Sequence, residues 1–205
     1  HKVKWPALLY HQNVLLRHYA LGSFRDLLFQ IAKDPAMVLY LDTQSNHRDH
    51  PNENFARELF ELFTLGEGHY TETDIKEAAR AFTGWHVALQ HGGGFAFNRR
   101  QHDSGVKHVL GKTGAFGGED ILAIALDQPA CARYITAKLW REFVSDEPDA
   151  REIERLAAEF RNSGYQIAPL LRGLLTLPQF WAPETRGALV KSPVELLIGT
   201  IRLLN

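Results

Sequence analysis

Two glutamates one helical turn apart are the first residues whose spacing could support chemistry. Glu58 and Glu61 fall within the apolar pattern of residues 53–65, which predicts a helix. At positions i and i+3 their Cβ atoms would lie about 5–6 Å apart. Such a pair could hold a hard divalent metal ion, or one carboxylate could act as a base whose pKa the other raises. In the alternative interpretation both face water or pair with Arg57, Arg80 or another arginine.

A histidine followed by an aspartate is the second candidate. His102 and Asp103 follow a strand-like segment and precede Gly105, which places both side chains at the rim of a small β element. Imidazole and carboxylate together can ligate a metal ion or act as an acid–base pair. Alternatively, Asp103 forms an Asx turn into Ser104 and Gly105, and His102 makes only local hydrogen bonds. The sequence is compatible with both interpretations.

The four residues Glu58, Glu61, His102 and Asp103 are therefore the candidate catalytic and metal-binding set, with a divalent metal as the implied cofactor. A shared ion would require the two motifs to meet in space, because metal ligands lie within about 2–2.6 Å of the ion. Helical di-metal sites normally add a Glu-x-x-His pair, which this sequence lacks. The glycine-rich stretches do not have the spacing of a phosphate-binding loop, and no Gly-x-Ser-x-Gly element occurs, so no further cofactor-binding residues are predicted.

Helical signals dominate the elements that must position these residues. Ser23 and the Asp34-Pro35 pair resemble helix starts, and Thr71 with Asp74 resembles a capping box. Leu59 and Leu62 are expected on the buried side of the helix 53–65, and Leu8, Leu15, Leu16 and Tyr19 on the inner side of the first helix. Helices are predicted near residues 6–20, 24–33, 35–41, 53–65, 71–83, 119–126, 129–144, 149–162, 168–177 and 193–204.

The hydrophobic period changes to two after residue 84. Residues 85–89 and 95–97 alternate on either side of a glycine-rich turn, and residues 106–110 could add a third short strand. The prediction is thus a mostly α fold: a single multi-helix globular domain over residues 1–205, with a small β-hairpin or three-stranded insertion near residues 85–110, within the segment 85–117.

Composition excludes some classes of partner. The chain has 205 residues, 45% of them hydrophobic and 23% charged, which is typical of a globular domain. Its 23 Lys and Arg nearly balance 24 Asp and Glu, so we expect no nucleic-acid partner, since such proteins carry a basic excess. No apolar run approaches the ~18 residues of a membrane span. The lone Cys131 is expected to be a buried, inert thiol.

Several long motifs run through the chain, at residues 51–66 (PNENFARELFELFTLG), 70–72, 77–85, 102–107, 110–111, 138–140 and 191–195. Together they resemble bacterial domain-of-unknown-function family 1800, over essentially the whole length. The resemblance implies an exported protein, periplasmic or extracellular, although the chain itself contains no signal peptide. It also implies a longer protein with a helical segment ahead of His1, often encoded beside a second exported protein. The family brings no established reaction, hence no catalytic residues to transfer.

Two functional hypotheses follow. In the first, the chain is a structural or interaction module of an exported protein, whose partners are the N-terminal remainder of its own chain and the second exported protein encoded nearby. In the second, it is a metal-dependent enzyme, a hydrolase being the expected class, which uses the four candidate residues. The first is favoured because neither constellation is complete.

Overall fold

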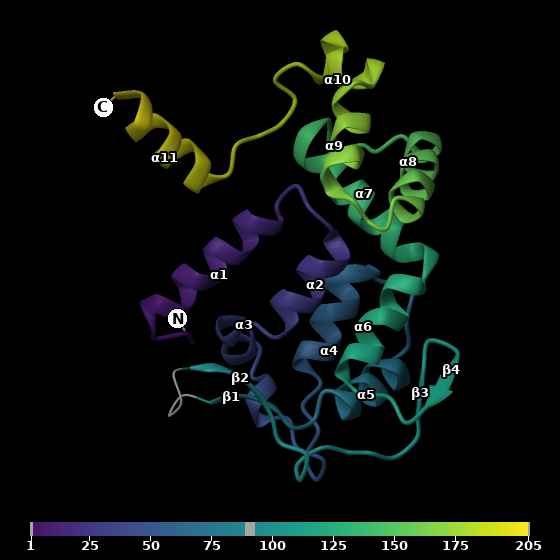
Figure 1. Cartoon of the computed structure of the whole chain (residues 1–205). Helices are drawn as coiled ribbons and strands as arrows, with labels where there is room; N and C mark the ends of the chain where they lie inside the picture. The colour runs from purple at the N-terminus through teal and green to yellow at the C-terminus, as the bar shows by residue number, and fades with distance from the viewer. Residues whose placement is uncertain (1, 89–92, 205) are drawn as a thin grey trace.

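The structure, a computed structural model, describes residues 2–88 and 93–204 as a mostly helical chain with two small β-hairpins at one end (Figure 1). The first half contains α1 (Pro6–Tyr19), α2 (Phe24–Ala32), α3 (Pro35–Tyr40), the 3₁₀ turn η1 (Thr43–Ser45), α4 (Asn54–Glu58), the π-helix η2 (Leu59–Thr64) and α5 (Glu72–Ala81). The second half contains α6 (Gly118–Asp127), α7 (Pro129–Phe143), α8 (Ala150–Asn162), α9 (Ile167–Leu175), α10 (Pro178–Trp181), the 3₁₀ turn η4 (Pro183–Thr185) and α11 (Pro193–Leu204). The predicted mostly α fold is confirmed.

Helix starts lie where the sequence places them. The Ser23 hydroxyl accepts the Asp26 N–H, and the Asp34 carboxylate accepts the Met37 N–H. Thr71 and Asp74 form the predicted capping box at the start of α5. These local bonds satisfy amides that the first turn of a helix leaves unpaired, which explains why sequence signals locate them well.

The main core lies where α7 packs against α6, α8, α9 and η2. Phe55, Phe82 and Trp85 form edge-to-face and tilted aromatic contacts at its lower end, where the first hairpin joins the helices. Backbone hydrogen bonds from Phe24 to Tyr165 and from Ile167 to Gly22 tie the α1–α2 turn to the α8–α9 turn. Segments distant in sequence are thereby fixed around one apolar interior.

The predicted helix 53–65 changes its winding half way. From Leu59 onward it is a π-helix, in which the Leu65 N–H donates to the Phe60 carbonyl five residues earlier at 2.8 Å. This widened turn shifts the register, so that Leu59 is fully buried while Leu62 is 44% exposed. The expectation that both leucines face the core is therefore wrong for Leu62. The freed Leu62 carbonyl accepts hydrogen bonds from Tyr134 Oη at 3.2 Å and Lys138 Nζ at 2.9 Å.

The β insertion consists of two separate hairpins. β1 (Trp85–Ala88) pairs antiparallel with β2 (Gly94–Phe97), while β3 (Lys107–Val109) pairs with β4 (Lys112–Gly114). The predicted third strand, β3, therefore forms a separate hairpin with β4 and does not pair with the first hairpin. The two-residue turn of this second hairpin places Leu110 and Gly111 at positive φ. The dipeptide Leu-Gly is not a strong sequence signal for such a turn. Residues 89–92 of the predicted strand and turn lie outside the described residues.

Two helices leave apolar side chains in solvent. α1 has no buried residue, and Leu16, predicted to face inward, is 43% exposed. α11 has no buried residue either, and Figure 1 shows it on the same side of the chain as α1, beyond a stretch without regular structure. We call the exposed apolar residues of these two helices and their flanks the α1–α11 face. Its members are Trp5, Tyr10, Val14, Leu16, Leu21, Val194, Leu196, Leu197, Ile198, Ile201, Leu203 and Leu204.

Candidate functional site

Asp103 belongs to a charged cluster centred on Arg80 of α5. Arg80 donates from Nε to Asp103 Oδ2 at 2.7 Å and from Nη1 to both carboxylate oxygens of Glu77 at 2.8 and 2.9 Å. These side chains are less than one third exposed. Hydrogen bonding to Arg80 lowers the pKa of Asp103, and the two carboxylates raise that of Arg80. The cluster holds the 103–106 loop against α5.

Lys107 lies beside this charged cluster. Its side chain is fully buried, and Nζ donates to the backbone carbonyls of Asp103 at 2.6 Å and Gly105 at 2.9 Å. Burial lowers the pKa of Lys107 because it disfavours the ammonium form. The Asp103 carboxylate also accepts the Gly105 N–H at 2.8 Å, which is the Asx turn of the alternative interpretation. Both charged residues thus serve the loop conformation.

His102 turns away from Asp103. Its Nδ1 lies 3.0 Å from the Thr83 carbonyl, which can only accept a hydrogen bond, so Nδ1 carries the proton in the neutral ring. The Thr83 hydroxyl in turn accepts the Asp103 N–H at 2.8 Å. Since the imidazole binds Thr83 and the carboxylate binds Arg80, the neighbouring residues do not form a His–Asp dyad. The Nε2 of His102 is left as an acceptor.

A shallow pocket of about 330 Å³ lies beside His102, between the first hairpin and the start of α6. Its lining includes Lys33, Trp85, Phe97, His102 and residues 117–120. Lys33 forms an ion pair with Glu119 across the pocket and lies 5.6 Å from the centre of the Phe95 ring. The volume is at the lower end of small-ligand sites. The sequence pointed to His102 but not to Lys33, which lies 69 residues earlier and carries no local signal.

Neither Glu58 nor Glu61 forms an ion pair with an arginine among the described residues. Glu61 accepts a hydrogen bond from Tyr70 Oη at 3.2 Å, while no hydrogen bond or ion pair from another described residue reaches the Glu58 carboxylate. Arg57 binds Glu53 and Glu72. The proposed pairing of Glu58 or Glu61 with Arg57 or Arg80 is therefore wrong, because each arginine already holds two other carboxylates.

No group of three or more His, Cys, Asp or Glu that could hold a metal ion occurs among residues 2–88 and 93–204. In particular, Glu58 and Glu61 do not join His102 and Asp103 in such a group. A catalytic or metal-binding role of these four residues stays a prediction. None of the described helices is long and apolar enough to cross a membrane.

Comparison with known proteins decides the family. The model of a family of proteins of unknown function, DUF1800, matches residues 1–205. The chain belongs to the DUF1800 family. No curated protein and no solved structure shows significant similarity to it. The DUF1800 resemblance proposed from the sequence motifs is thus confirmed, and the residues of those motifs that the structure describes include Arg80, Asp103, Lys107 and Lys138.

A first prediction concerns the candidate carboxylates. Glu58→Gln is expected to change the free energy of unfolding by less than about 0.5 kcal/mol, because no described cation is left unpaired by the change. Addition of Mg²⁺, Ca²⁺, Mn²⁺ or Zn²⁺ should leave the melting temperature of both proteins nearly unchanged. An ion at a hundred times its dissociation constant would add about 2.7 kcal/mol, so thermal melts would detect it. A metal-dependent shift seen only with Glu58 intact would contradict this expectation.

A second prediction concerns acid. Because Arg80 lowers the pKa of Asp103, the cluster contributes stability that is complete above the unfolded-state pKa of about 3.9 and is lost as the pH falls through the lower folded-state pKa. Urea titrations between pH 6 and pH 2 should therefore show a smaller acid-dependent loss for Asp103→Asn than for the unmutated chain. Equal losses would show that Asp103 is not held by Arg80 in solution.

A third prediction concerns Cys131, which is fully buried in α7. Burial raises the pKa of its thiol to about 12, so the reactive thiolate is scarce at neutral pH. We expect the native protein to react with Ellman's reagent only as fast as it unfolds, and the denatured protein within seconds. Rapid reaction of the native thiol would reveal an exposed, activated cysteine instead.

Proposed function

We propose that the chain is a structural and interaction module whose α1–α11 face is covered by other polypeptide. The observation that carries this proposal is α11, which exposes seven large aliphatic side chains and buries none. Isolated helices shorter than about 12–15 residues are marginal in water, and most helical stability comes from packing an apolar face. A 12-residue apolar helix that no other surface covers is therefore expected to bind a partner.

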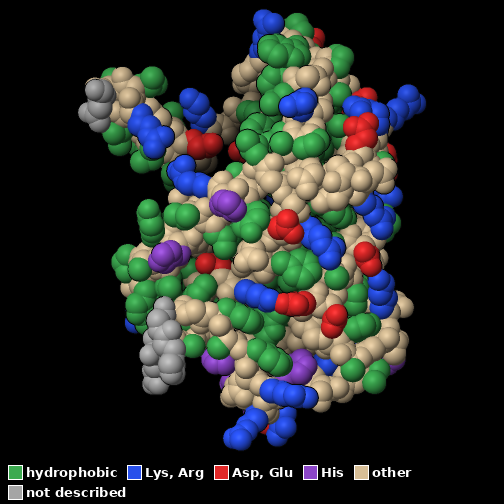
Figure 2. Space-filling view, viewed as in Figure 1, with side chains coloured by type: hydrophobic (Ala, Val, Ile, Leu, Met, Phe, Trp, Pro, Cys, Tyr) green, Lys and Arg blue, Asp and Glu red, His purple; other side chains and the backbone are tan. Residues whose placement is uncertain are grey.

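The total surface supports the same conclusion. The chain exposes 12,146 Å², whereas a folded monomer of 23.2 kDa is expected to expose about 9,700 Å². The excess of about 2,400 Å² on this one chain exceeds the roughly 800 Å² that each partner buries in a standard interface, and with an equal area on the partner it would fall in the range of obligate interfaces, roughly 2,000–5,000 Å² in total. Figure 2 shows hydrophobic side chains in the open over α11 and α1.

The charged motif residues favour this function over catalysis. Arg80, Asp103 and Lys107 bind one another or nearby backbone, and Lys138 binds the Leu62 carbonyl at the π-helix. Gly84 in the same motifs adopts a φ of +84°, and a Cβ there would lie 2.5 Å from the Asn98 carbonyl oxygen. These residues thus stabilise the 103–106 loop, the first hairpin and the π-helix, which is a structural role. No observation on the described residues favours the metal-dependent hydrolase.

We further propose that the covering polypeptide is the N-terminal remainder of the same chain, in an exported bacterial protein. The motifs of DUF1800 support this occupant, since the resemblance implies a helical segment ahead of His1. Helices from that segment would pack on α1 and α11 and complete a bundle. The second exported protein encoded nearby is the competing occupant.

The test supplies the N-terminal remainder as a separate polypeptide and measures complex formation by sedimentation. We expect a 1:1 complex, abolished by the double substitution Leu197→Ser and Ile201→Ser on α11. Leu175→Ser on α9, where the side chain is also exposed, is the matched control and should leave the complex intact. Failure to form a complex would reject this occupant, and a complex with the second exported protein alone would replace it.

A further inference from the structure

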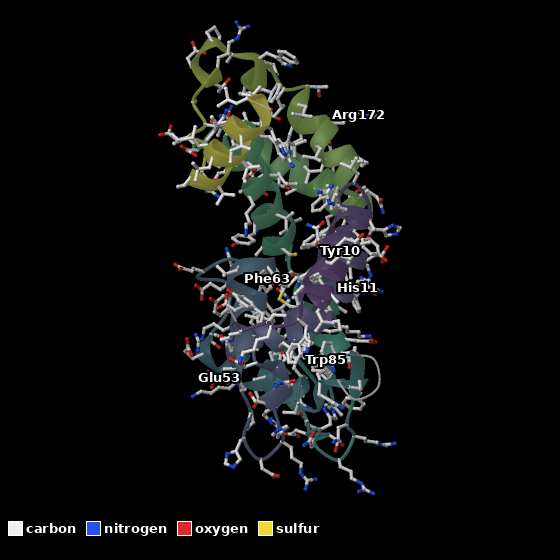
Figure 3. All side chains as sticks on the ribbon, turned by 90° about the vertical axis from the view of Figure 1, so that its left-hand side faces the viewer. Tyr10, His11, Glu53, Phe63, Trp85 and Arg172 are labelled. Carbon is white, nitrogen blue, oxygen red and sulfur yellow. The ribbon has the colours of Figure 1, made fainter. Side chains whose placement is uncertain are left out.

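The α1–α11 face is bordered by unpaired positive charge. The sequence has no Asp or Glu before Asp26, while Lys2, Lys4, Arg17 and Arg25 fall in the same stretch. Lys2 is paired with Asp42, but no carboxylate of a described residue lies within ion-pair distance of Lys4 or Arg17. His11 and His18 are exposed on the same helix, and Figure 3 views the chain from this side with Tyr10 and His11 labelled on α1.

Cations also flank the α11 side of the face. Lys191 and Arg202 form no ion pair with any residue that the structure describes. The one acidic residue of α11, Glu195, accepts the Ser192 N–H at 2.8 Å and so is already engaged at the start of the helix. Both helices thus combine exposed apolar side chains with cations, in the helix or just before it, that form no ion pair with a described residue. Of these cations, Lys191 lies near enough to the Glu195 carboxylate to interact with it electrostatically.

The shape of the apolar surface distinguishes a protein partner from a lipid bilayer. With 3.6 residues per turn, the exposed aliphatic side chains of α11 span roughly 220° of its circumference. A flat bilayer surface can cover only about half of a helix, and helices that lie on membranes keep a broad polar face. A helix that is apolar on more than half of its surface is covered by packing within a bundle.

An apolar groove beside α10 (Pro178–Trp181) provides an anchoring point. It encloses about 350 Å³ between the C-terminal end of α7 and the segment that leads to α11, and its walls include Phe143, Phe180, Trp181 and Leu189. Trp181 is 64% exposed although its indole N–H is bound to the Leu175 carbonyl. Large side chains of a docking helix could fill such a groove, as hot-spot residues do at interfaces.

From these observations we infer that the occupant of the α1–α11 face is helical and acidic, with an apolar stripe bordered by Asp and Glu side chains. Its carboxylates meet Lys4, Arg17 and Arg202, and its stripe packs between α1 and α11. Charge complementarity of this kind selects among partners and fixes their orientation. This inference rests on the proposed function, because it names the chemistry of the partner at the same face.

The experiment uses two synthetic helical peptides as probes, with an identical leucine stripe but flanked by Glu in one and by Lys in the other. Fluorescence anisotropy with the 205-residue chain should give a Kd at least ten-fold lower for the Glu peptide at low salt. The ratio should shrink as NaCl is raised, since salt screens exposed charges. Lys4→Glu combined with Arg17→Glu should abolish the preference. Lys76→Glu with Arg151→Glu, exposed cations on α5 and α8, is the charge-matched control and should retain it.

Four other results would each overturn the inference of an acidic helical partner. Equal affinity for both peptides would reject an acidic partner while the interaction module stands. Binding of neither peptide by a monomeric chain would reject the proposed function as well. Self-association that Leu197→Ser with Ile201→Ser disrupts would make a second copy the occupant. Tight binding to phosphatidylglycerol vesicles, but not to phosphatidylcholine vesicles or to either peptide, would replace the helix by a lipid surface.

Discussion

Leu59→Ala is expected to lower the free energy of unfolding by about 3–5 kcal/mol, the largest effect of any substitution considered. Leu59 is fully buried at the start of the π-helix η2, inside the main core. Truncation removes its apolar contacts and leaves a cavity that a well-packed core fills only in part. Urea denaturation followed by circular dichroism measures the loss.

Leu62→Ala provides the matched control for this prediction. Leu62 lies three residues further along the same helix, where regular α-helical winding would place it on the same side as Leu59. Because the π-turn shifts its register and leaves it 44% exposed, we expect a loss of less than about 1 kcal/mol. Similar losses for both substitutions would mean that residues 59–64 wind as an ordinary α-helix in solution.

Arg80→Ala is expected to cost about 3 kcal/mol. The substitution leaves the carboxylates of Glu77 and Asp103 close together, largely buried and without the cation that binds both. Removing one partner of a buried ion pair is costly because the remaining charge loses its compensation. The expected value is at the low end of that range because the three side chains keep some contact with solvent.

One further substitution separates geometry from charge in this cluster, and another on α8 provides an exposed control. Arg80→Lys keeps the charge but loses the planar fork that binds two carboxylates at once, so we expect an intermediate loss. Arg155→Ala breaks two ion pairs of a 47% exposed arginine on α8 and should cost less than about 1 kcal/mol. If Arg80→Ala were as mild as Arg155→Ala, the cluster would not hold the 103–106 loop.

Local chemistry explains what could be predicted from the sequence. Helix caps such as Ser23 and the Thr71–Asp74 box depend on bonds within three residues, so their residue types locate them. The π-helix could not be predicted in this way, because the apolar pattern of residues 53–65 fits an unbroken α-helix. Its wide turn depends on α7, whose Tyr134 and Lys138 satisfy the Leu62 carbonyl from more than seventy residues away.

At the candidate site, too, the contacts that depend on distant residues could not be predicted from the sequence. The sequence identified His102 and Asp103 as chemically interesting neighbours, but their side chains diverge to Thr83 and Arg80, which tertiary packing brings together. The apolar pattern of the first helix predicted an inner side, but it could not show that Leu16 would stay exposed while α1 packs on α2 and α3. For α11 the available sequence signal is the breadth of its apolar arc, which exceeds what one covered side of a surface helix requires.

Amide hydrogen exchange shows whether α11 depends on a covering partner for its stability. In the 205-residue chain alone, as a monomer, we predict that the amides of residues 193–204 exchange nearly as fast as in an unfolded peptide, since no side chain of α11 is buried. Adding the N-terminal remainder of the protein as a separate polypeptide should slow their exchange by about 100-fold or more, equivalent to roughly 2.7 kcal/mol of local stabilisation. Strong protection of α11 in the monomer, or exchange that stays fast when the remainder is added, would contradict the account.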